Sequence, residues 1–73
     1  MTAATLQTIK DRLDALDTEA LIANACALML STQKDLAEES GVSPTTITEI
    51  KRGKRATKSQ RSAIYWAIAL RIT

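Results

Sequence analysis

The sequence predicts an all-α protein of about five helices, and three observations support this prediction. Apolar residues recur at intervals of three and four along most of the chain, as they do on one face of a helix. No segment shows the alternation of apolar and polar residues that is typical of a half-buried strand. The only proline, Pro44, and one of the two glycines, Gly41, stand where one short helix would end and the next begin. A single domain is expected over residues 1–73.

Composition excludes several classes of protein. Apolar residues make up 45% of the 73 residues and charged residues 25%, which is typical of a small soluble globular domain. Cys26 is the only cysteine, so no internal disulfide and no thiolate zinc site can form. The N-terminus has no basic segment followed by an apolar run, and no run of about 18 apolar residues occurs anywhere. These features predict a cytoplasmic protein, in a bacterium or a phage-infected cell, with no membrane association.

The first two expected helices differ in how much of their surface is apolar. An N-terminal helical extension, residues 1–17, carries a helix of about residues 4–16 with one narrow apolar stripe, formed by Leu6, Ile9, Leu13 and Leu16. Asp17 or Thr18 would then cap a second helix. That helix is apolar over more than half of its circumference, at Leu21, Ile22, Ala25, Cys26, Leu28, Met29 and Leu30. We therefore expect it to be the central, most buried helix, with Cys26 as a small core residue.

Residues 32–52 predict two short helices joined by a tight turn. Thr32 is a favourable N-cap for a helix over residues 33–40, and Asp35 three residues later suits both the cap and the helix dipole. Gly41 tolerates the positive φ that a helix end requires. A hydroxyl and then a proline, Ser43 and Pro44, begin a second helix over residues 44–51.

The closing helix, expected over residues 58–71, has two apolar faces. One face comprises Ala63, Trp66, Ala67 and Leu70, and the neighbouring face Ile64, Ile68 and Ile72. A helix that is apolar on two sides in so small a domain indicates a second surface to bury, such as a dimer interface. A homodimer is therefore expected through the Trp66 and Leu70 face, or through the stripe of Leu6, Ile9, Leu13 and Leu16.

Charge is divided sharply along the chain. Residues 1–50 carry three cations and eight anions, whereas residues 51–73 carry seven cations and no anion. Such an asymmetry is typical of proteins that bind a polyanion, although a membrane surface or an acidic protein also fits it. The aromatic content of 3% disfavours readers of single-stranded DNA or RNA, which stack bases on exposed rings.

The spacing in residues 32–52 resembles the helix-turn-helix of the lambda repressor and Cro family of DNA-binding domains, the XRE type. The resemblance rests on Gln33, Ala37, Gly41, Val42, Ile47 and Ile50, and on the basic loop of Gly53, Lys54 and Arg55. The alanine-rich segment of residues 66–72 is similar to that family's closing helix, so the resemblance covers about residues 18–72. It implies a lambda-repressor-like helical bundle that binds a double-stranded DNA operator. The length of 73 residues favours a compact phage Cro-like regulator over a cleavable two-domain repressor.

The chain departs from that family at both ends. The family has a further short helix after the closing one, and this sequence instead has the helix of residues 4–16. Two alternatives follow: the extra helix fills the vacant packing position, or its leucine stripe binds another subunit.

The resemblance also implies which residues contact DNA. The second helix of the motif enters the major groove, so the base-reading set is Ser43, Pro44, Thr45, Thr48, Glu49 and Arg52. The implied contacts to the DNA backbone are Gln33, Thr46, Lys51, Lys54, Arg55, Lys58 and Arg61, with Thr57 and Ser59 as neutral donors. None of the base-reading pairs is the bidentate arginine–guanine type, so affinity is expected to come mostly from phosphates.

Other interpretations remain open for these residues. Glu49 would pair with Arg52 as readily as with a base, and Gln33, Thr45 and Thr48 would also serve as ordinary helix surface. The chain has no histidine and no glycine-rich phosphate loop, so no catalytic residue, metal site, cofactor or small-molecule ligand is expected. The main rival function is a protein-interaction module on the same fold, such as an antitoxin, an antirepressor or an adaptor.

Overall fold

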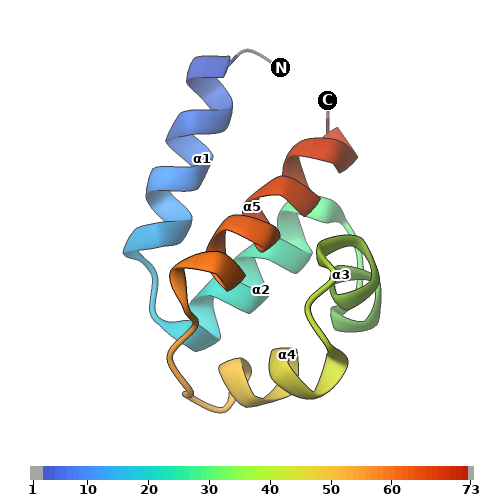
Figure 1. Ribbon diagram of the computed structural model, residues 1–73. Helices are drawn as coiled ribbons and strands as arrows, with labels where there is room; N and C mark the ends of the chain where they lie inside the picture. Colours follow the sequence, from blue (N-terminus) through green and yellow to red (C-terminus); the bar gives the residue numbers. More distant parts are fainter. Residues whose placement is uncertain (1–2, 73) are drawn as a thin grey trace.

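Five α-helices and no strand make up residues 3–72, the part of the chain that the computed structural model describes (Figure 1). The helices are α1 (Ala3–Ala15), α2 (Thr18–Met29), α3 (Gln33–Ser40), α4 (Pro44–Lys51) and α5 (Lys58–Ile72). The all-α prediction is therefore confirmed, and the expected helix bounds agree to within a residue or two. Of the apolar positions expected on α5, the side chain of Ile72 lies outside the described residues.

Hydrogen bonds at the helix starts show why the chain breaks where it does. Asp17, one of the two candidates, caps α2 by accepting from the backbone N–H of Ala20 at 2.8 Å. Thr32 and Asp35 form the capping box at the start of α3, with both bonds at 3.3 Å. Each cap satisfies N–H groups that a helix start would leave without a partner.

The core lies between α2 and α5, and the other three helices close it. Its largest fully buried side chains are Leu21, Ile22, Leu36, Ile47, Ile50, Ile64 and Ile68. In Figure 1, α5 crosses in front of α2, with α1 on one side and α3 on the other. Both central helices contact α3 and α1, and α2 also contacts α4. One apolar cluster therefore holds all five helices.

The leucine stripe of α1 packs against this same core. Leu13 is 2% exposed, and Ile9 and Leu16 pack against the buried cluster. Of the two alternatives for the N-terminal helix, the structure therefore shows the first: the helix packs on its own chain. Only Leu6, which is half-buried, extends the stripe beyond that contact.

Two leucines expected in the core are exposed instead. Leu28 is 41% exposed and Leu30 92%. Helix α2 ends at Met29, and Leu30 adopts the left-handed conformation with φ 54°. The N–H of Leu30 bonds the carbonyl of Ala27, and the N–H of Ser31 bonds that of Cys26. This is a Schellman helix end with leucine where glycine is usual, so Leu30 leaves the helical pattern that predicted its burial.

The arrangement places α4 at one extremity of the molecule. The start of α1 and the end of α5 lie together at the opposite extremity (Figure 1). Helix α4 therefore lies away from the described start of α1 and the described end of α5.

In the described part of the chain, no helix is both long enough and apolar enough to cross a membrane.

Candidate nucleic-acid interface

The turn between α3 and α4 is fixed by hydrogen bonds at each of its positions. Gly41 has φ 75°, and its N–H donates to the carbonyl of Ala37 at 3.0 Å, which ends α3. The N–H of Val42 donates to Ser40 Oγ at 3.2 Å. Ser43 then caps α4 by accepting from the N–H of Thr46 at 3.2 Å. The two helices are thus held at a set angle, as a helix-turn-helix requires.

Helix α4 has one buried face and one open face. Ile47 and Ile50 are 1% and 0% exposed, and they attach the helix to the core. The predicted base-reading residues lie elsewhere on the helix and its caps: Ser43, Pro44, Thr45, Glu49 and Arg52 are exposed, and Thr48 is half-buried. Apart from Pro44, the side chains of the open face carry hydrogen-bonding groups, which suits contact with base edges in a DNA groove.

The hydroxyl groups of α4 differ in what they already bind. Ser43 Oγ donates to Thr46 Oγ1 at 2.8 Å, and Thr48 Oγ1 donates to the carbonyl of Pro44 at 3.0 Å. Within residues 3–72, Thr45 makes no side-chain hydrogen bond that would compete with a base. Among the threonines of this helix, Thr45 therefore offers the hydroxyl that is most available to a ligand.

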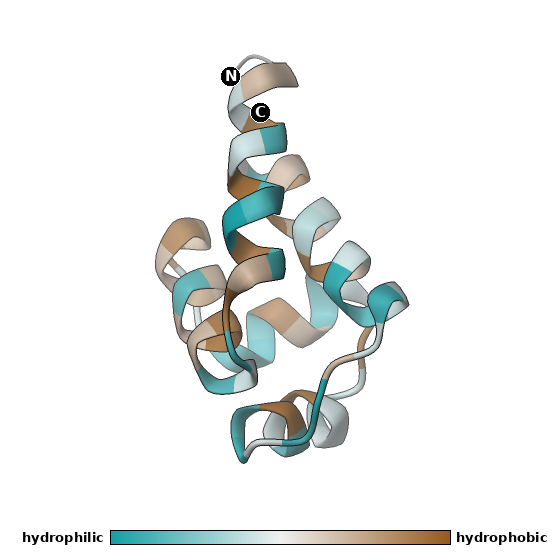
Figure 2. Ribbon diagram, turned by 90° about the vertical axis from the view of Figure 1, so that its left-hand side faces the viewer, coloured by the Kyte–Doolittle hydropathy of each residue, from teal (hydrophilic) through white to brown (hydrophobic). Residues whose placement is uncertain are grey.

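A second glycine turn holds the basic loop beside α4. Gly53 has φ 111°, its N–H bonds the carbonyl of Ile50, and the N–H of Lys54 bonds that of Glu49, both at 3.0 Å. This pair of bonds is the Schellman helix end. Lys51, Arg52, Lys54, Arg55 and Lys58 are all exposed. Figure 2 shows this segment as mostly hydrophilic, at the lower edge of the molecule next to α4.

Glu49 forms an ion pair with a different residue from Arg52, the partner that its sequence spacing suggests. Its carboxylate pairs with Lys54 Nζ at 3.1 Å, and not with Arg52. The pairing arises because the Schellman turn folds Lys54 back toward α4, which spacing along a helix cannot show. Both side chains are about half exposed, at 66% for Lys54 and 46% for Glu49, so the pair is weak and can open when an anion binds Lys54.

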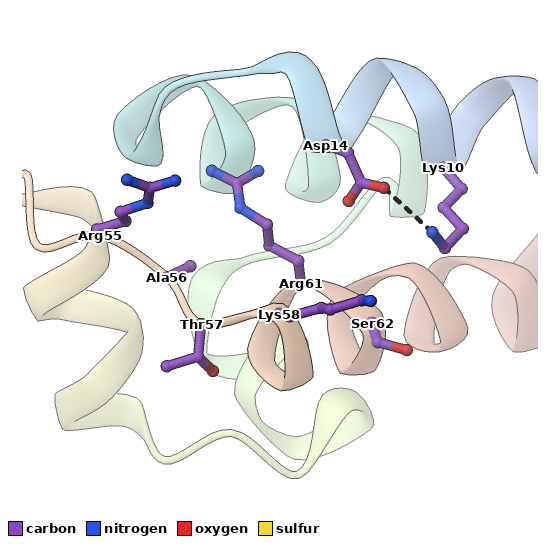
Figure 3. Close-up of a pocket in the computed structure, with 8 residues that line it drawn as sticks. All are labelled: Lys10, Asp14, Arg55, Ala56, Thr57, Lys58, Arg61 and Ser62. Atoms are coloured by element: carbon purple, nitrogen blue, oxygen red, sulfur yellow. Dashed lines mark hydrogen bonds and ion pairs between the residues drawn. The ribbon is translucent and has the colours of Figure 1, made fainter.

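Arg61 has a structural role that the sequence did not indicate. Its guanidinium donates to the carbonyl of Leu13 at 2.8 Å and to that of Leu16 at 3.0 Å. Figure 3 shows the Arg61 side chain extending from α5 toward α1. These carbonyls belong to the C-terminal end of α1, where a helix lacks hydrogen-bond partners and attracts cations. Arg61 therefore fastens α1 to α5, and we propose that this, rather than a phosphate contact, is its role.

Thr57 likewise belongs to the framework. It caps α5 by accepting from the N–H of Gln60 at 3.1 Å, and Gln60 Oε1 accepts from the N–H of Thr57 at 2.9 Å. The Thr57 hydroxyl, which the resemblance offers as a neutral DNA donor, thus forms a capping box whose Thr-x-x-Gln signal is present in the sequence.

The remaining predicted backbone contact, Gln33, begins α3. It is half-buried at the first position of that helix, where free N–H groups favour an anion.

Cys26 packs against the core, and burial is the main factor that raises the pKa of its thiol from the ordinary value of 9.0. A thiol with a raised pKa is a poor nucleophile, which fits a packing role.

The fold and this surface together define a helix-turn-helix protein of the DNA-binding class. The helix-turn-helix family model matches residues 22–72, and the chain belongs to that family, in its lambda repressor and Cro type. The match begins within α2 and includes α3, α4 and α5, so α1 lies outside it. No curated protein and no solved structure matches the chain.

Proposed function

We propose that this chain is a sequence-specific transcriptional regulator, a small phage Cro-like repressor, that inserts α4 into the major groove of double-stranded DNA. One observation carries the proposal: the open, hydrogen-bonding face of α4 is followed directly by a basic turn that two backbone hydrogen bonds hold in place. Membership of the helix-turn-helix family supports duplex DNA as the partner. On this proposal the protein binds DNA in the cytoplasm, residues 1–73 act as one unit, and it catalyses no reaction.

The proposed base-reading set is Ser43, Pro44, Thr45, Thr48, Glu49 and Arg52. Threonine hydroxyls bond to base edges and threonine methyl groups contact thymine, while Glu49 accepts from cytosine. Since Ser43 and Thr48 already bond within the helix, Thr45 is the main candidate for direct readout. With so few direct contacts, DNA shape and bridging water contribute a large share of the specificity.

The proposed backbone set is Gln33, Thr46, Lys51, Lys54, Arg55 and Lys58. If four or five cations, Arg52 included, neutralise phosphates, log K falls against log salt with a slope of about −3.6 to −4.5 per monomer. The test is fluorescence anisotropy of random-sequence duplex DNA, titrated with the protein from about 50 to 300 mM salt. A steep negative slope supports the proposal, and absence of binding at the lowest salt contradicts it.

A double substitution tests the basic turn itself. Lys54→Ala with Arg55→Ala removes two exposed cations while Gly53 and the backbone bonds of the Schellman turn remain. We expect weaker binding to every sequence alike and a slope reduced by about 2. Lys34→Ala with Arg12→Ala is the control, because it removes the same charge from residues outside the proposed set. Equal losses in the two double variants would show that only net charge matters.

A homodimer is the second part of the proposal. Trp66 is 57% exposed and Leu70 72%, on the side of α5 that faces away from the core. The Trp66 ring packs on Tyr65, with ring centroids 5.2 Å apart. A second copy that covers this face would present two α4 helices to two half-sites. Analytical ultracentrifugation of Trp66→Ser with Leu70→Ser tests it, since the variant should stay monomeric at concentrations where the parent chain dimerises.

The rival function, an interaction module that binds a protein in place of DNA, is favoured by the same exposed side chains. Leu28, Leu30, Trp66 and Leu70 give a small domain several apolar groups in contact with water. The salt series separates the two functions, because an adaptor does not need the basic turn. Failure to bind duplex DNA would direct the search to protein partners.

A further inference from the structure

A basic pocket lies where α1 meets the start of α5, beyond the helix-turn-helix itself. Its volume is about 510 Å³. Lys10 and Asp14 of α1 line it on one side, and Arg55, Lys58, Arg61 and Ser62 line it on the other. Figure 3 shows Arg55 on the loop after α4, and Lys10 and Asp14 on α1 across from Lys58, Arg61 and Ser62 on α5. The pocket therefore continues the basic surface of Lys54 and Arg55 onto a helix that the family match does not cover.

The electrostatics of the pocket favour an anion. Four cationic side chains line it against a single carboxylate, that of Asp14. Arg61 is engaged by the carbonyls of α1, and Lys10 Nζ pairs with Asp14 at 3.1 Å. Within residues 3–72, Arg55 and Lys58 have no acidic partner. The N-terminal end of α5 contributes its positive dipole to the same place.

We propose that this pocket binds a phosphate of the DNA backbone beside the groove that α4 occupies, with Lys10 of α1 as a contact that extends the footprint. The inference rests on the proposed function, since it takes duplex DNA as the ligand. Arg55 connects the two surfaces, because it belongs to the basic turn after α4 and also lines the pocket. A DNA strand that passes the turn therefore meets Lys58 and then Lys10 as it leaves α4.

Asp14 restrains this contact in the free protein. It holds the Lys10 ammonium group and places a negative charge in the pocket where the phosphate would lie. Both side chains are partly exposed, at 34% for Lys10 and 44% for Asp14, so the pair is weak enough to exchange for a phosphate. The bound state gains the Lys10 contact at the cost of repulsion from Asp14.

The test compares three variants of the full chain on one duplex over the same salt series. Lys10→Gln removes the proposed contact, so the slope of log K against log salt should become shallower by about 0.9, with a loss of about three- to eightfold at 0.1 M salt. Arg12→Gln is the matched control. It lies two residues away on the same helix and removes the same charge, but Arg12 lines a different pocket, beside Leu28 and Asn24. Its slope should equal that of the parent chain.

Asp14→Asn gives a signature of opposite sign. It breaks the same ion pair as Lys10→Gln but releases the ammonium group and removes the repulsive carboxylate. We expect binding about two- to fourfold tighter, which is the range of a weak surface charge interaction. Loss of helix stability cannot produce this pattern, because both variants lose the same pair and only one loses affinity. Circular dichroism melting curves of the three variants check that all are folded at the assay temperature.

The outcomes separate this inference from the proposed function. If the parent chain does not bind duplex DNA at low salt, the proposed function fails. If the parent chain binds with a steep slope while Lys10→Gln and Arg12→Gln give equal slopes, the proposed function stands and the pocket is not a phosphate site. A weakened Asp14→Asn variant would likewise overturn the inference, since Asp14 would then support binding. Only a shallower Lys10→Gln slope together with a tighter Asp14→Asn complex supports it.

Discussion

Arg61→Ala should destabilise the fold without removing a DNA contact. The guanidinium of Arg61 bridges the carbonyls of Leu13 and Leu16, at 2.8 and 3.0 Å. These two bonds join positions 48 and 45 residues apart in the sequence. Alanine would leave both carbonyls to water and would remove the cation from the C-terminal end of α1.

The expected loss follows from the number and type of these bonds. A hydrogen bond that involves a charged group contributes about 1.5–3 kcal/mol when buried. Because both bonds are only partly buried, water replaces part of each bond, and we expect a total loss of about 2–3 kcal/mol. In a domain of this size, each kcal/mol lowers Tm by roughly 4–8 °C, so the fall should be about 8–24 °C.

Urea unfolding followed by circular dichroism measures this loss, and the salt series on DNA measures the contact. Arg61→Lys should lose about half as much stability, since a single ammonium group replaces the two-pronged guanidinium. Lys58 is an exposed neighbour whose side chain makes no hydrogen bond within residues 3–72, so Lys58→Ala should stay within about 0.5 kcal/mol of the parent chain. An Arg61→Ala variant with the parent's stability but a shallower salt slope would refute the structural role and restore the phosphate role.

Four further predictions test single positions. Thr45→Ala should change base preference in a selection from random sequences while leaving the salt slope unchanged, because it removes a hydroxyl and no charge. Gly41→Ala should lower the free energy of unfolding in urea by about 1 kcal/mol: φ is 75°, and apart from the adjoining residues no atom lies within 4 Å of the added Cβ, so the loss comes from backbone strain. Leu30→Gly should stabilise the chain by about 0.5–1 kcal/mol in the same assay, because it relieves a left-handed leucine that is 92% exposed. The pKa of the Cys26 thiol is higher in the folded chain than in the unfolded chain, so the unfolded chain loses the thiol proton at a lower pH. The free energy of unfolding should therefore fall as pH rises past 9.0. Cys26→Ala should reduce that fall, as the difference between urea midpoints at about pH 8 and pH 10 would show.

The sequence was sufficient to predict the helices and their ends, because those features depend on local chemistry. Thr32 with Asp35, Ser43 with Pro44, and Gly41 each act within four residues of their own position, so their signals are contained in short segments. The same locality explains the prediction of the buried face of α4, since Ile47 and Ile50 are spaced for one side of a helix.

Local signals failed where the chain left a regular helix. Leu30 continues the apolar pattern of α2 in the sequence. The helix ends one residue earlier, however, and the Leu30 side chain is exposed to water. Glu49 has Arg52 at helical spacing, but the turn at Gly53 brings Lys54 to it instead. In both cases a positive φ redirects the chain, and residue spacing alone carries no information about that change of direction.

The sequence by itself determined an all-α helix-turn-helix and the concentration of positive charge after residue 50. Only the tertiary structure decided how that charge is divided. It assigns Arg61 to the end of α1, pairs Lys54 with Glu49, and brings Lys10 from the acidic half of the chain to the basic pocket. The physical reason is distance in sequence. Charge is a property of each residue, but which charges meet depends on the packing of helices that lie tens of residues apart.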